Sequence, residues 1–341
     1  MMSEAPALRQ DGPGFLDRVA GGAVLGLARG LGALPPALGD AVGAALGAVA
    51  YAVDARHRAR AVENLRRAGV APDAAAARRL ARQVFQNLGR GFADMCRLPR
   101  STDAAIAAGV RFEGYERLRA ARALGRGVIA VTAHLGAWEL LPVASALQGD
   151  PIHVVVRPMD NATLDRAITA LRTRGGNGII PKRDLMRAGL KVLKAGGTLG
   201  ILMDQNITWR EGVFVEFFGR PASTAYAPAL LALRTGAAVL PAAIFREGPG
   251  RHRVVIEEAI PLARTGDLRH DLQENTARFT RAIEAFVRRS PAEWFWVHRR
   301  WKTQPPAAAG APPPDAAAPG PPPPPTEGER EVGAPRGGGR P

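Results

Sequence analysis

A histidine and a glutamate interrupt an apolar stretch of the chain, GVIAVTAHLGAWELLP at residues 127–142. His134 follows a run of Val, Ile and Ala that is typical of a buried strand, and Glu139 comes five positions later inside a second apolar segment. A neutral imidazole can take a proton from a hydroxyl group, and a carboxylate behind it can fix the tautomer of the ring. The pair therefore predicts general-base chemistry; the alternative is a core histidine beside a glutamate at a helix start.

The spacing of the pair restricts where it can sit. On one continuous helix the two side chains would point about 140° apart, so we expect His134 on a turn from strand to helix and Glu139 one turn inside the helix. The chain has no Gly-x-Ser-x-Gly elbow, and Cys96 lies in an earlier helical region. The attacking hydroxyl would then belong to a second substrate, which indicates transfer and not hydrolysis.

Polar residues also follow the next predicted strand, in the segment VVVRPMDN. The guanidinium of Arg157 is suited to a phosphate or a developing oxyanion, although a salt bridge with Asp160 or Asp165 is an equally good explanation. Asp160 or Asn161 can cap a helix over residues 161–174.

A third polar strand end lies in LMDQNITWREGVFVEFFGRPAST, where Asp204 and Gln205 precede a nearly continuous apolar loop. Polar groups beside such a loop suit an amphiphilic ligand. The loop could also fold back over the core as an extra strand, and the two interpretations can both hold. Ser223 or Thr224 is expected to cap a helix over 224–235. The predicted substrate-binding residues are Arg157, Asn161, Arg183, Asp204, Gln205 and Thr224.

Strand-like and helix-like segments alternate after residue 114. The predicted strands are 127–133, 152–158, 178–180, 198–204, 237–246 and 253–259. The predicted helices are 72–98, 138–147, 161–174, 184–195 and 224–235. This alternation predicts an α/β fold with a largely parallel mixed sheet flanked by helices.

The formal net charge of +15 predicts attraction to anions such as phosphate-bearing lipids, acidic proteins or nucleic acid. The block EWFWVHRRWK at 293–302 mixes tryptophans with cations, which is typical of membrane interfaces and compatible with nucleic acid. No helix-turn-helix or RNP-like pattern favours nucleic acid, so we expect no such partner. A single cysteine and no Cys/His cluster at zinc spacing predict no metal site.

The two ends of the chain differ from its middle in composition. Residues 14–70 are apolar and helical with an arginine-rich flank, which predicts either membrane contact or an Ala/Gly-rich helical hairpin packed on the body. Residues 71–303 form the predicted α/β domain. Residues 1–13 and the Pro/Ala/Gly-rich tail 304–341 are expected to be disordered.

Four blocks occur in the order and approximate spacing of a known family: GVIAVTAHLGAWEL, VVVRPMDNATLD, LMDQN with GVFVEFFGRPASTA, and EWFWVHRRWK. With these blocks the chain resembles the lipid A biosynthesis late acyltransferases, the lauroyl/myristoyl transferase family within the lysophospholipid acyltransferase superfamily. The resemblance covers about residues 15–303. Two residues depart from the common pattern, Ala137 where Asn is usual and Val156 where an aromatic residue is usual.

The resemblance implies an enzyme at the cytoplasmic face of the inner membrane that moves an acyl group from an acyl carrier protein thioester to a hydroxyl of a lipid A precursor. It implies that His134 and Glu139 are catalytic and that no metal or bound cofactor is needed. Another lysolipid or glycolipid acceptor remains an alternative. A non-catalytic protein that binds membrane surfaces or nucleic acid through its charge is the alternative from another class.

Overall fold

The computed structural model describes residues 15–305, without the side chains of 15–20 and 23. The chain divides into two units at Gln304, and the second, Pro305–Pro341, lies almost entirely outside the described residues. The disorder expected for 1–13 and 304–341 likewise falls outside the description, except at its inner edge. In the first unit the apolar segment 14–70 and the α/β region belong together.

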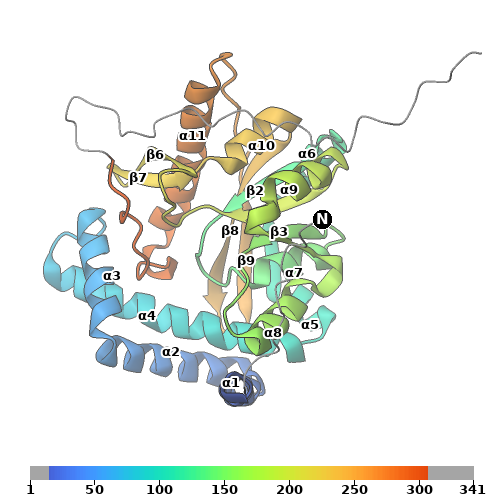
Figure 1. Cartoon of the computed structure of the whole chain (residues 1–341). Helices are drawn as coiled ribbons and strands as arrows, with labels where there is room; N and C mark the ends of the chain where they lie inside the picture. Colours follow the sequence, from blue (N-terminus) through green and yellow to red (C-terminus); the bar gives the residue numbers. More distant parts are fainter. Residues whose placement is uncertain (1–14, 306–341) are drawn as a thin grey trace, which may run out of the picture. The chain divides into compact units, whose positions relative to one another are not determined.

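A seven-stranded sheet forms the centre of the described unit (Figure 1). Its strands are β1 (Val110–Glu113), β2 (Val128–Thr132), β3 (Ile152–Val156), β4 (Gly178–Pro181), β5 (Thr198–Leu202), β8 (Ala238–Gly248) and β9 (Arg251–Ile256). They lie in the order β1-β9-β8-β2-β5-β3-β4. All neighbouring pairs are parallel except β8 and β9. The predicted α/β fold with a largely parallel mixed sheet is confirmed.

Helices cover both faces of this sheet. They are α5 (Asp103–Gly109), α6 (Tyr115–Ala123), α7 (Leu140–Leu147), α8 (Ala162–Arg172), α9 (Leu185–Lys194), α10 (Ala227–Thr235) and α11 (Leu268–Arg289), with short 3₁₀ turns η1 (Leu98–Arg100), η2 (Arg174–Gly176), η3 (Lys182–Asp184) and η4 (Pro291–Glu293). Successive strand residues face opposite sides, so Val128 belongs to the core cluster with α5–α8, and Ile129 to the cluster with α9–α11.

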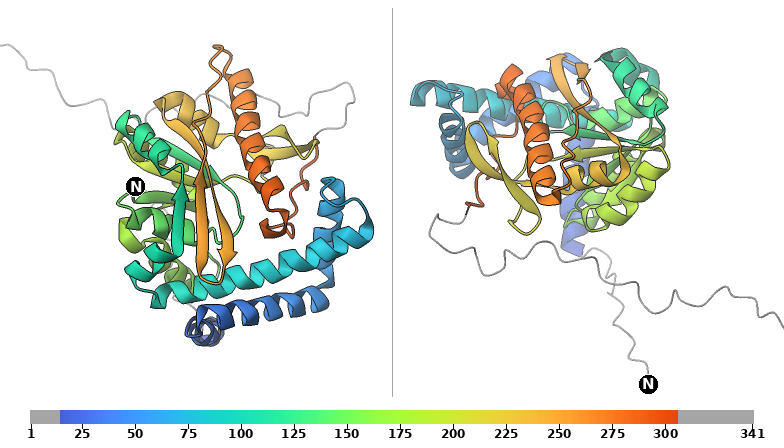
Figure 2. Two further views of the ribbon diagram at one scale, coloured as in Figure 1. Left: turned by 180° about the vertical axis from the view of Figure 1, so that it is seen from behind. Right: turned by 90° about the horizontal axis from the view of Figure 1, so that it is seen from above.

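The N-terminal segment folds as four helices, α1 (Phe15–Gly32), α2 (Pro36–Val53), α3 (Ala55–Arg67) and α4 (Ala74–Arg97). Helix α2 lies along α4, as both views show (Figures 1 and 2). Small residues permit this close approach, since a Cβ added at Gly43 would stand 2.6 Å from the carbonyl oxygen of Gly89. The alternative of a helical hairpin packed on the body is therefore correct for the inner side of α2.

A buried polar contact also ties α2 to the sheet. Asp40 of α2 forms an ion pair with Arg246 of β8, and lies 3.4 Å from the Nε atom of Arg90 of α4. Within the described residues α2 is nevertheless the helix that is long and apolar enough to cross a membrane by length and composition. Half of its residues are exposed, and only Gly39, Gly43 and Gly47 are buried.

The apolar loop after Asp204 is a β-hairpin of β6 (Gly212–Phe217) and β7 (Arg220–Ala225). Phe218 and Gly219 form its two-residue turn, both with positive φ, as hairpin turns require. Val215, Phe217 and Phe218 are buried, so the extra strand over the core is the correct interpretation. The helix predicted to begin at Ser223 or Thr224 begins at Ala227, because both residues pair within β7 and Pro228 sets the first helical turn.

The aromatic block near residue 300 lies in the core and not at the surface. Trp294, Trp296 and Trp301 are buried, and Arg300 is fully inaccessible. The interpretation of these tryptophans as a membrane-interface surface is therefore wrong. Their rings pack against Phe217 and Phe218 of the hairpin. This packing buries apolar surface of the tryptophans and of the hairpin together.

Candidate active site

The register of the central strands brings two polar residues to one edge of the sheet. Strands β2 and β5 are parallel neighbours, and Thr132 stands opposite Leu202 at their carboxyl ends. His134 and Asp204 each follow two residues beyond this pair. Ligands of open α/β sheets bind at this edge, so the topology places both residues next to the expected substrate site.

His134 and Asp204 form a hydrogen-bonded pair. The Nδ1 atom of His134 lies 2.8 Å from one carboxylate oxygen of Asp204, and the backbone N–H of His134 donates to the other at 2.9 Å. The indole N–H of Trp294 donates to that second oxygen at 2.7 Å. The carboxylate is buried and the imidazole is 20% exposed. These contacts place the ring proton on Nδ1 and leave Nε2 as the proton acceptor.

The pair is electrostatically coupled. Burial alone would lower the pKa of His134, but the charge of Asp204 and its hydrogen bond outweigh burial and raise the pKa above its ordinary value. Burial would raise the pKa of Asp204, yet the imidazole and three hydrogen bonds hold it below its ordinary value. Asp204 therefore stays ionised and stabilises a protonated imidazole.

The loop that carries His134 is fixed from two sides. The backbone N–H of Phe295 donates to the carbonyl oxygen of His134 at 3.1 Å, and Leu135 forms a bridge with Trp294. Gly136 adopts a left-handed conformation with φ of 60°, and a Cβ there would collide with the carbonyl oxygen of Ile244. A glycine is needed at this close approach.

Glu139 does not contact the imidazole by a hydrogen bond. It directly precedes α7 and binds Arg172 of α8 through two hydrogen bonds, at 2.9 and 2.5 Å. The contact with the imidazole that was expected of Glu139 is made by Asp204, which the sequence had indicated as a substrate-binding residue. Glu139 still raises the pKa of His134 through its charge, while Arg172 lowers it. The sequence predicted that His134 and Asp204 each follow a strand, but it could not show that these two strands are neighbours, because strand order and register are long-range properties.

A cavity of about 720 Å³ opens beside the pair. The apolar side chains that line it include Leu141, Ile152, Val154, Met186 and Leu230, and the polar ones include His134, Glu139, Arg157, Arg172, Lys182, Arg183 and Gln205. The amide nitrogen of Gln205 stands 3.4 Å from Nε2 of His134. A volume of this size, lined by apolar side chains together with a set of charged and polar ones, suits an amphiphile with an acyl chain and a polar group.

Three of the predicted substrate-binding residues reach this cavity, namely Arg157, Arg183 and Gln205. The Arg157 side chain is 84% exposed and lies 4.0 Å from Asp160, so it is largely free to turn toward a ligand. Of the two departures from the family pattern, Val156 lines the cavity and Ala137 is buried in the core.

Asn161 and Thr224 do not line the cavity. Asn161 caps α8 by accepting from the N–H groups of Thr163 and Leu164, as its position before that helix predicted. Thr224 is inaccessible and accepts a hydrogen bond from Arg300 at 2.5 Å. Both residues therefore stabilise the structure around the site and do not line the cavity.

The sequence indicated Arg300 only as one of the cations of the aromatic block at 293–302. Its guanidinium donates to the carbonyl oxygen of Ser223 at 2.8 Å and toward that of Gln205 at 3.4 Å, and it stacks on Phe217. Burial lowers its pKa to about 10 despite the charge of Asp204. In the described part of the chain, no group of three or more His, Cys, Asp or Glu side chains is arranged to hold a metal ion.

The region that contains these residues is similar to known proteins. The family model for bacterial lipid A biosynthesis acyltransferases matches residues 18–303. The chain belongs to this family. It is an O-acyltransferase of the lipid A type. His134, Asp204 and the residues that line the cavity all lie within the matched region.

Individual relatives of this acyltransferase are distant. The chain is 28% identical to the lipid A biosynthesis lauroyltransferase of Escherichia coli K12, over 67% of this chain and 73% of the relative. It is 27% identical to the phosphatidylinositol mannoside acyltransferase of Mycobacterium tuberculosis H37Rv, over 70% and 75%. It is also 27% identical to the palmitoleoyltransferase of lipid A biosynthesis in E. coli K12, over 57% and 61%.

Proposed function

We propose that this acyltransferase moves a fatty acyl group from an acyl carrier protein thioester to a hydroxyl of a lipid A precursor, with His134 as the general base. The observation that supports the proposal most is the His134–Asp204 pair, whose histidine lines a cavity that also has many apolar side chains. A base alone would fit many reactions. A base beside a cavity for one long chain, in this family, fits acyl transfer to a lipid alcohol.

The proposed reaction has two steps. Nε2 of His134 takes the proton of the acceptor hydroxyl as its oxygen attacks the thioester carbonyl, which forms a C–O bond and a tetrahedral oxyanion. The imidazolium, held by Asp204, then gives that proton to the departing sulfur as the C–S bond breaks. The products are an ester and a free thiol, and the imidazole returns to its neutral form.

Polar side chains that line the cavity supply the remaining functions in this proposal. The amide of Gln205 lies close enough to Nε2 to bind the hydroxyl or the oxyanion next to it. Arg157 and Arg183 bind a phosphate of the acceptor, since a guanidinium matches phosphate geometry. Glu139 neutralises Arg172 and so keeps a cation from depressing the basicity of His134.

The acyl donor and the cellular location of the enzyme are part of the same proposal. Acyl carrier protein is the expected donor and partner, and the cytoplasmic face of the inner membrane is the expected location. Support comes from the basic chain, which attracts acidic partners and anionic lipids, and from the apolar outer surface of α2. No metal or tightly bound cofactor enters the proposed steps.

The test is acyl transfer by the purified full chain from a long-chain acyl carrier protein thioester to a lipid A precursor, followed by mass spectrometry. An ester product at one acceptor hydroxyl, together with free thiol in equal amount, is the expected result. The same assay with the corresponding coenzyme A thioester decides the donor. No product with either donor on this acceptor would contradict the proposal.

A glycolipid acceptor other than lipid A is the second candidate. The mannoside acyltransferase relatives favour it, because they match the chain about as well as the lipid A enzymes do. Presenting the lipid A precursor, a phosphatidylinositol mannoside and a lysophospholipid in one competition assay ranks the three acceptors. The acceptor with the highest kcat/KM defines the function.

A further inference from the structure

The catalytic cavity reaches both faces of the central sheet. Val128 packs with α5–α8, so Ala130, two residues further along β2, faces the same side. Ala130 lines the cavity together with Leu141 of α7, whereas Met186 of α9 and Leu230 of α10 line it from the other side. We call the part between the sheet and α7 the α7 limb. A cavity with two limbs has room for two substrates, as a transfer reaction requires.

The sheet opens between β3 and β5 at its carboxyl edge. The pairing of β3 with β5 ends at Val154 and Gly200. Beyond this point β5 continues beside β2 as far as Leu202, and β3 continues beside β4 as far as Val156. Gly200 is thus the last residue of β5 that pairs with β3, and it lines the cavity. The opening explains how one cavity reaches both faces of the sheet.

Gly200 lies at the inner end of the α7 limb. It stands between Ala130 of β2 and Val154 of β3, and all three residues line the cavity. The next row toward the interior contains Val128 and Thr198, which are 0% and 1% exposed and do not line the cavity. The limb therefore ends at the row that has Gly200 at its centre.

The missing side chain of Gly200 leaves this end of the limb open. Its backbone belongs to an extended strand and lacks the positive φ that requires a glycine at Gly136. A Cβ at Gly200 would stand 3.1 Å from the Cδ1 atom of Ile152 and 3.7 Å from the Cγ1 atom of Val154. The three nearest atoms all belong to β3, so the space toward α7 stays free for a ligand. A glycine inside a strand often marks the close approach of a ligand.

The chemistry of the α7 limb fits an uncharged alkyl chain. Its charged residues Glu139 and Arg172 bind each other through two hydrogen bonds, so they leave no net charge there. Arg183, which is suited to a phosphate, comes from the turn η3 that leads into α9 of the other limb. An acceptor that carries a phosphate therefore fits the α9 side, and the acyl chain of the donor fits the α7 limb.

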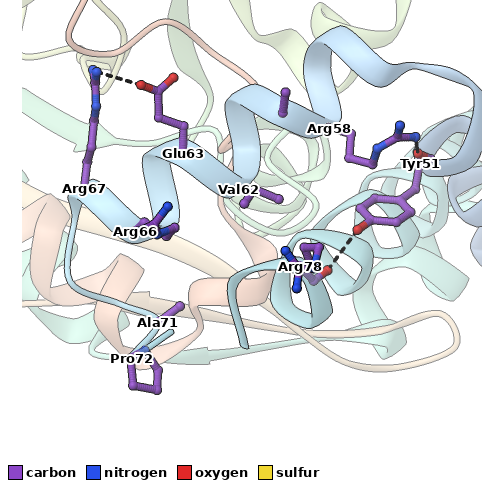
Figure 3. A pocket seen from close by; sticks show the side chains of 10 residues that line it. Tyr51, Arg58, Val62, Glu63, Arg66, Arg67, Ala71, Pro72 and Arg78 are labelled. Carbon is purple, nitrogen blue, oxygen red and sulfur yellow. Dashed lines mark hydrogen bonds and ion pairs between the residues drawn. The ribbon is translucent and has the colours of Figure 1, made fainter. Parts of the chain in front are cut away.

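A second cavity, of about 850 Å³, lies on the N-terminal helices and has a different character (Figure 3). Its lining includes four arginines and one carboxylate, namely Arg58, Arg66, Arg67, Arg78 and Glu63. An alkyl chain bound there would displace water from guanidinium groups, which is unfavourable. The α7 limb is the better site for the chain, because its only charged pair is already neutralised.

The depth of the α7 limb can be expressed in carbon atoms. Ala130, the neighbour of Gly200 on β2, comes four residues before His134. At the rise of a strand this corresponds to about 13 Å. An extended alkyl chain advances about 1.25 Å per carbon, so roughly ten carbons fit between the base and Gly200. Donors from octanoyl to palmitoyl bracket this length.

We infer that Gly200 determines the length of the acyl chain that the enzyme transfers, because it ends the limb in which the chain of the donor lies. The inference rests on the proposed acyl-transfer function and adds to it a residue for donor specificity. Gly200 acts on the far part of the chain and not on the proton transfer at His134.

The test is acyl transfer by the purified full chain with octanoyl, decanoyl, lauroyl, myristoyl and palmitoyl thioesters of acyl carrier protein. In Gly200→Val, kcat/KM for the donor that the wild type prefers should fall about 10- to 100-fold, because the new side chain fills the end of the limb. The next shorter donors of the series should retain their rates. Gly200→Ala should give a smaller shift in the same direction. An unchanged order of donors in Gly200→Val would overturn the inference.

Ile152→Val provides the opposite change. It removes the Cδ1 atom that lies nearest to the Cβ position of Gly200, so the preference should move toward longer donors. The double variant Gly200→Ala/Ile152→Val should return to the wild-type profile, since the volume added at one position is removed at the other. A double variant with the same profile as Gly200→Ala would place the chain elsewhere and contradict the inference.

Gly189→Ala is the matched control on the other face of the sheet. A Cβ at Gly189 would stand 3.2 Å from the Cδ1 atom of Leu199, which is as crowded as at Gly200, but Gly189 does not line the cavity. This variant should keep the wild-type order of donors. The same shift in Gly189→Ala as in Gly200→Ala would show a general effect of packing and overturn the inference.

Acceptors whose own chains differ in length separate the two possible occupants of the α7 limb. Gly200→Val should rank these acceptors as the wild type does, because the limb holds the chain of the donor. A changed order of acceptors with an unchanged order of donors would place an acceptor chain in the limb and overturn the inference.

Thermal unfolding in the presence of saturated fatty acids of the same lengths gives a readout that does not depend on turnover. The fatty acid that raises the melting temperature most should be shorter for Gly200→Val than for the wild type. This shift without any transfer by the wild type would reject the proposed function alone. Transfer with an unchanged order of donors in the variants would reject the inference alone. Melting temperatures without ligand confirm that each variant is folded.

Discussion

Nδ1 of His134 lies 2.8 Å from a carboxylate oxygen of Asp204, although 70 residues separate them in the chain. The contact follows from the pairing of Thr132 with Leu202, which sets the ends of two parallel strands side by side. Two residues beyond a shared register position, the side chains meet at the edge where such sheets bind ligands. The following predictions depend on this contact.

Replacing Asp204 with asparagine should lower the pKa of His134. The wild-type pKa lies above the ordinary value because of the Asp204 charge, and only the neutral imidazole acts as a base, so activity rises as pH increases through that pKa. Asp204→Asn removes the charge and should move this acidic limb to lower pH. The plateau rate should fall on the order of 10²-fold or more, since the imidazolium loses its partner. Nitrogen NMR titration of His134 and the pH profile of kcat/KM measure the two effects.

Glu139→Gln should lower the same pKa by a smaller amount. The substitution removes a carboxylate that raises the pKa of His134, and it leaves Arg172, which lowers it, without its partner. The shift is smaller than for Asp204→Asn because Glu139 makes no hydrogen bond to the ring. NMR titration of both variants compares them directly. A larger shift in Glu139→Gln than in Asp204→Asn would return the orienting role to Glu139.

Glu139 and Asp204 show which part of the site could be predicted from the sequence and which part could not. The alternation of apolar segments predicted six strands whose positions are confirmed, because each strand is a local pattern of buried Val, Ile and Leu. That pattern also placed His134 and Asp204 at strand ends. Which strands are neighbours depends on contacts between distant segments, so the sequence paired His134 with the nearby Glu139 instead.

Other elements were hidden for different physical reasons. Helix α11 carries many charged residues and reveals its buried side only through widely spaced positions such as Phe279, Ile283 and Phe286. The tryptophans near residue 300 have charged neighbours in the sequence, which suggests a surface position. In the structure, however, their neighbour Arg300 is buried and donates to a backbone carbonyl oxygen of a distant segment. Tertiary partners of this kind leave no local signal.

Gly136→Ala should impair both stability and activity. The new Cβ would collide with the carbonyl oxygen of Ile244, and φ of 60° is unfavourable for alanine. The loop that carries His134 must then move, so kcat should fall while the melting temperature decreases. Gly149→Ala is the matched control, because Gly149 also has positive φ, at 87°, but has open space around its Cβ. Equal loss of activity in both variants would show that backbone strain alone is responsible.

Arg300→Met should destabilise the fold by about 1–3 kcal/mol, because the buried carbonyl oxygen of Ser223 and the hydroxyl of Thr224 lose their donor. Urea unfolding measures the change. Arg299→Met, at an exposed neighbour, should have little effect.

Thr224→Val should reduce stability without changing KM for the lipid acceptor, and an altered KM would restore Thr224 as a substrate-binding residue.

The most direct test of the account is the rate of acyl transfer by His134→Ala under single-turnover conditions, with saturating donor and acceptor. The account predicts a loss of about 10²- to 10⁴-fold and a residual rate that no longer follows the ionisation seen in the wild type. A rate within a few-fold of the wild type, with the same dependence on pH, would contradict it.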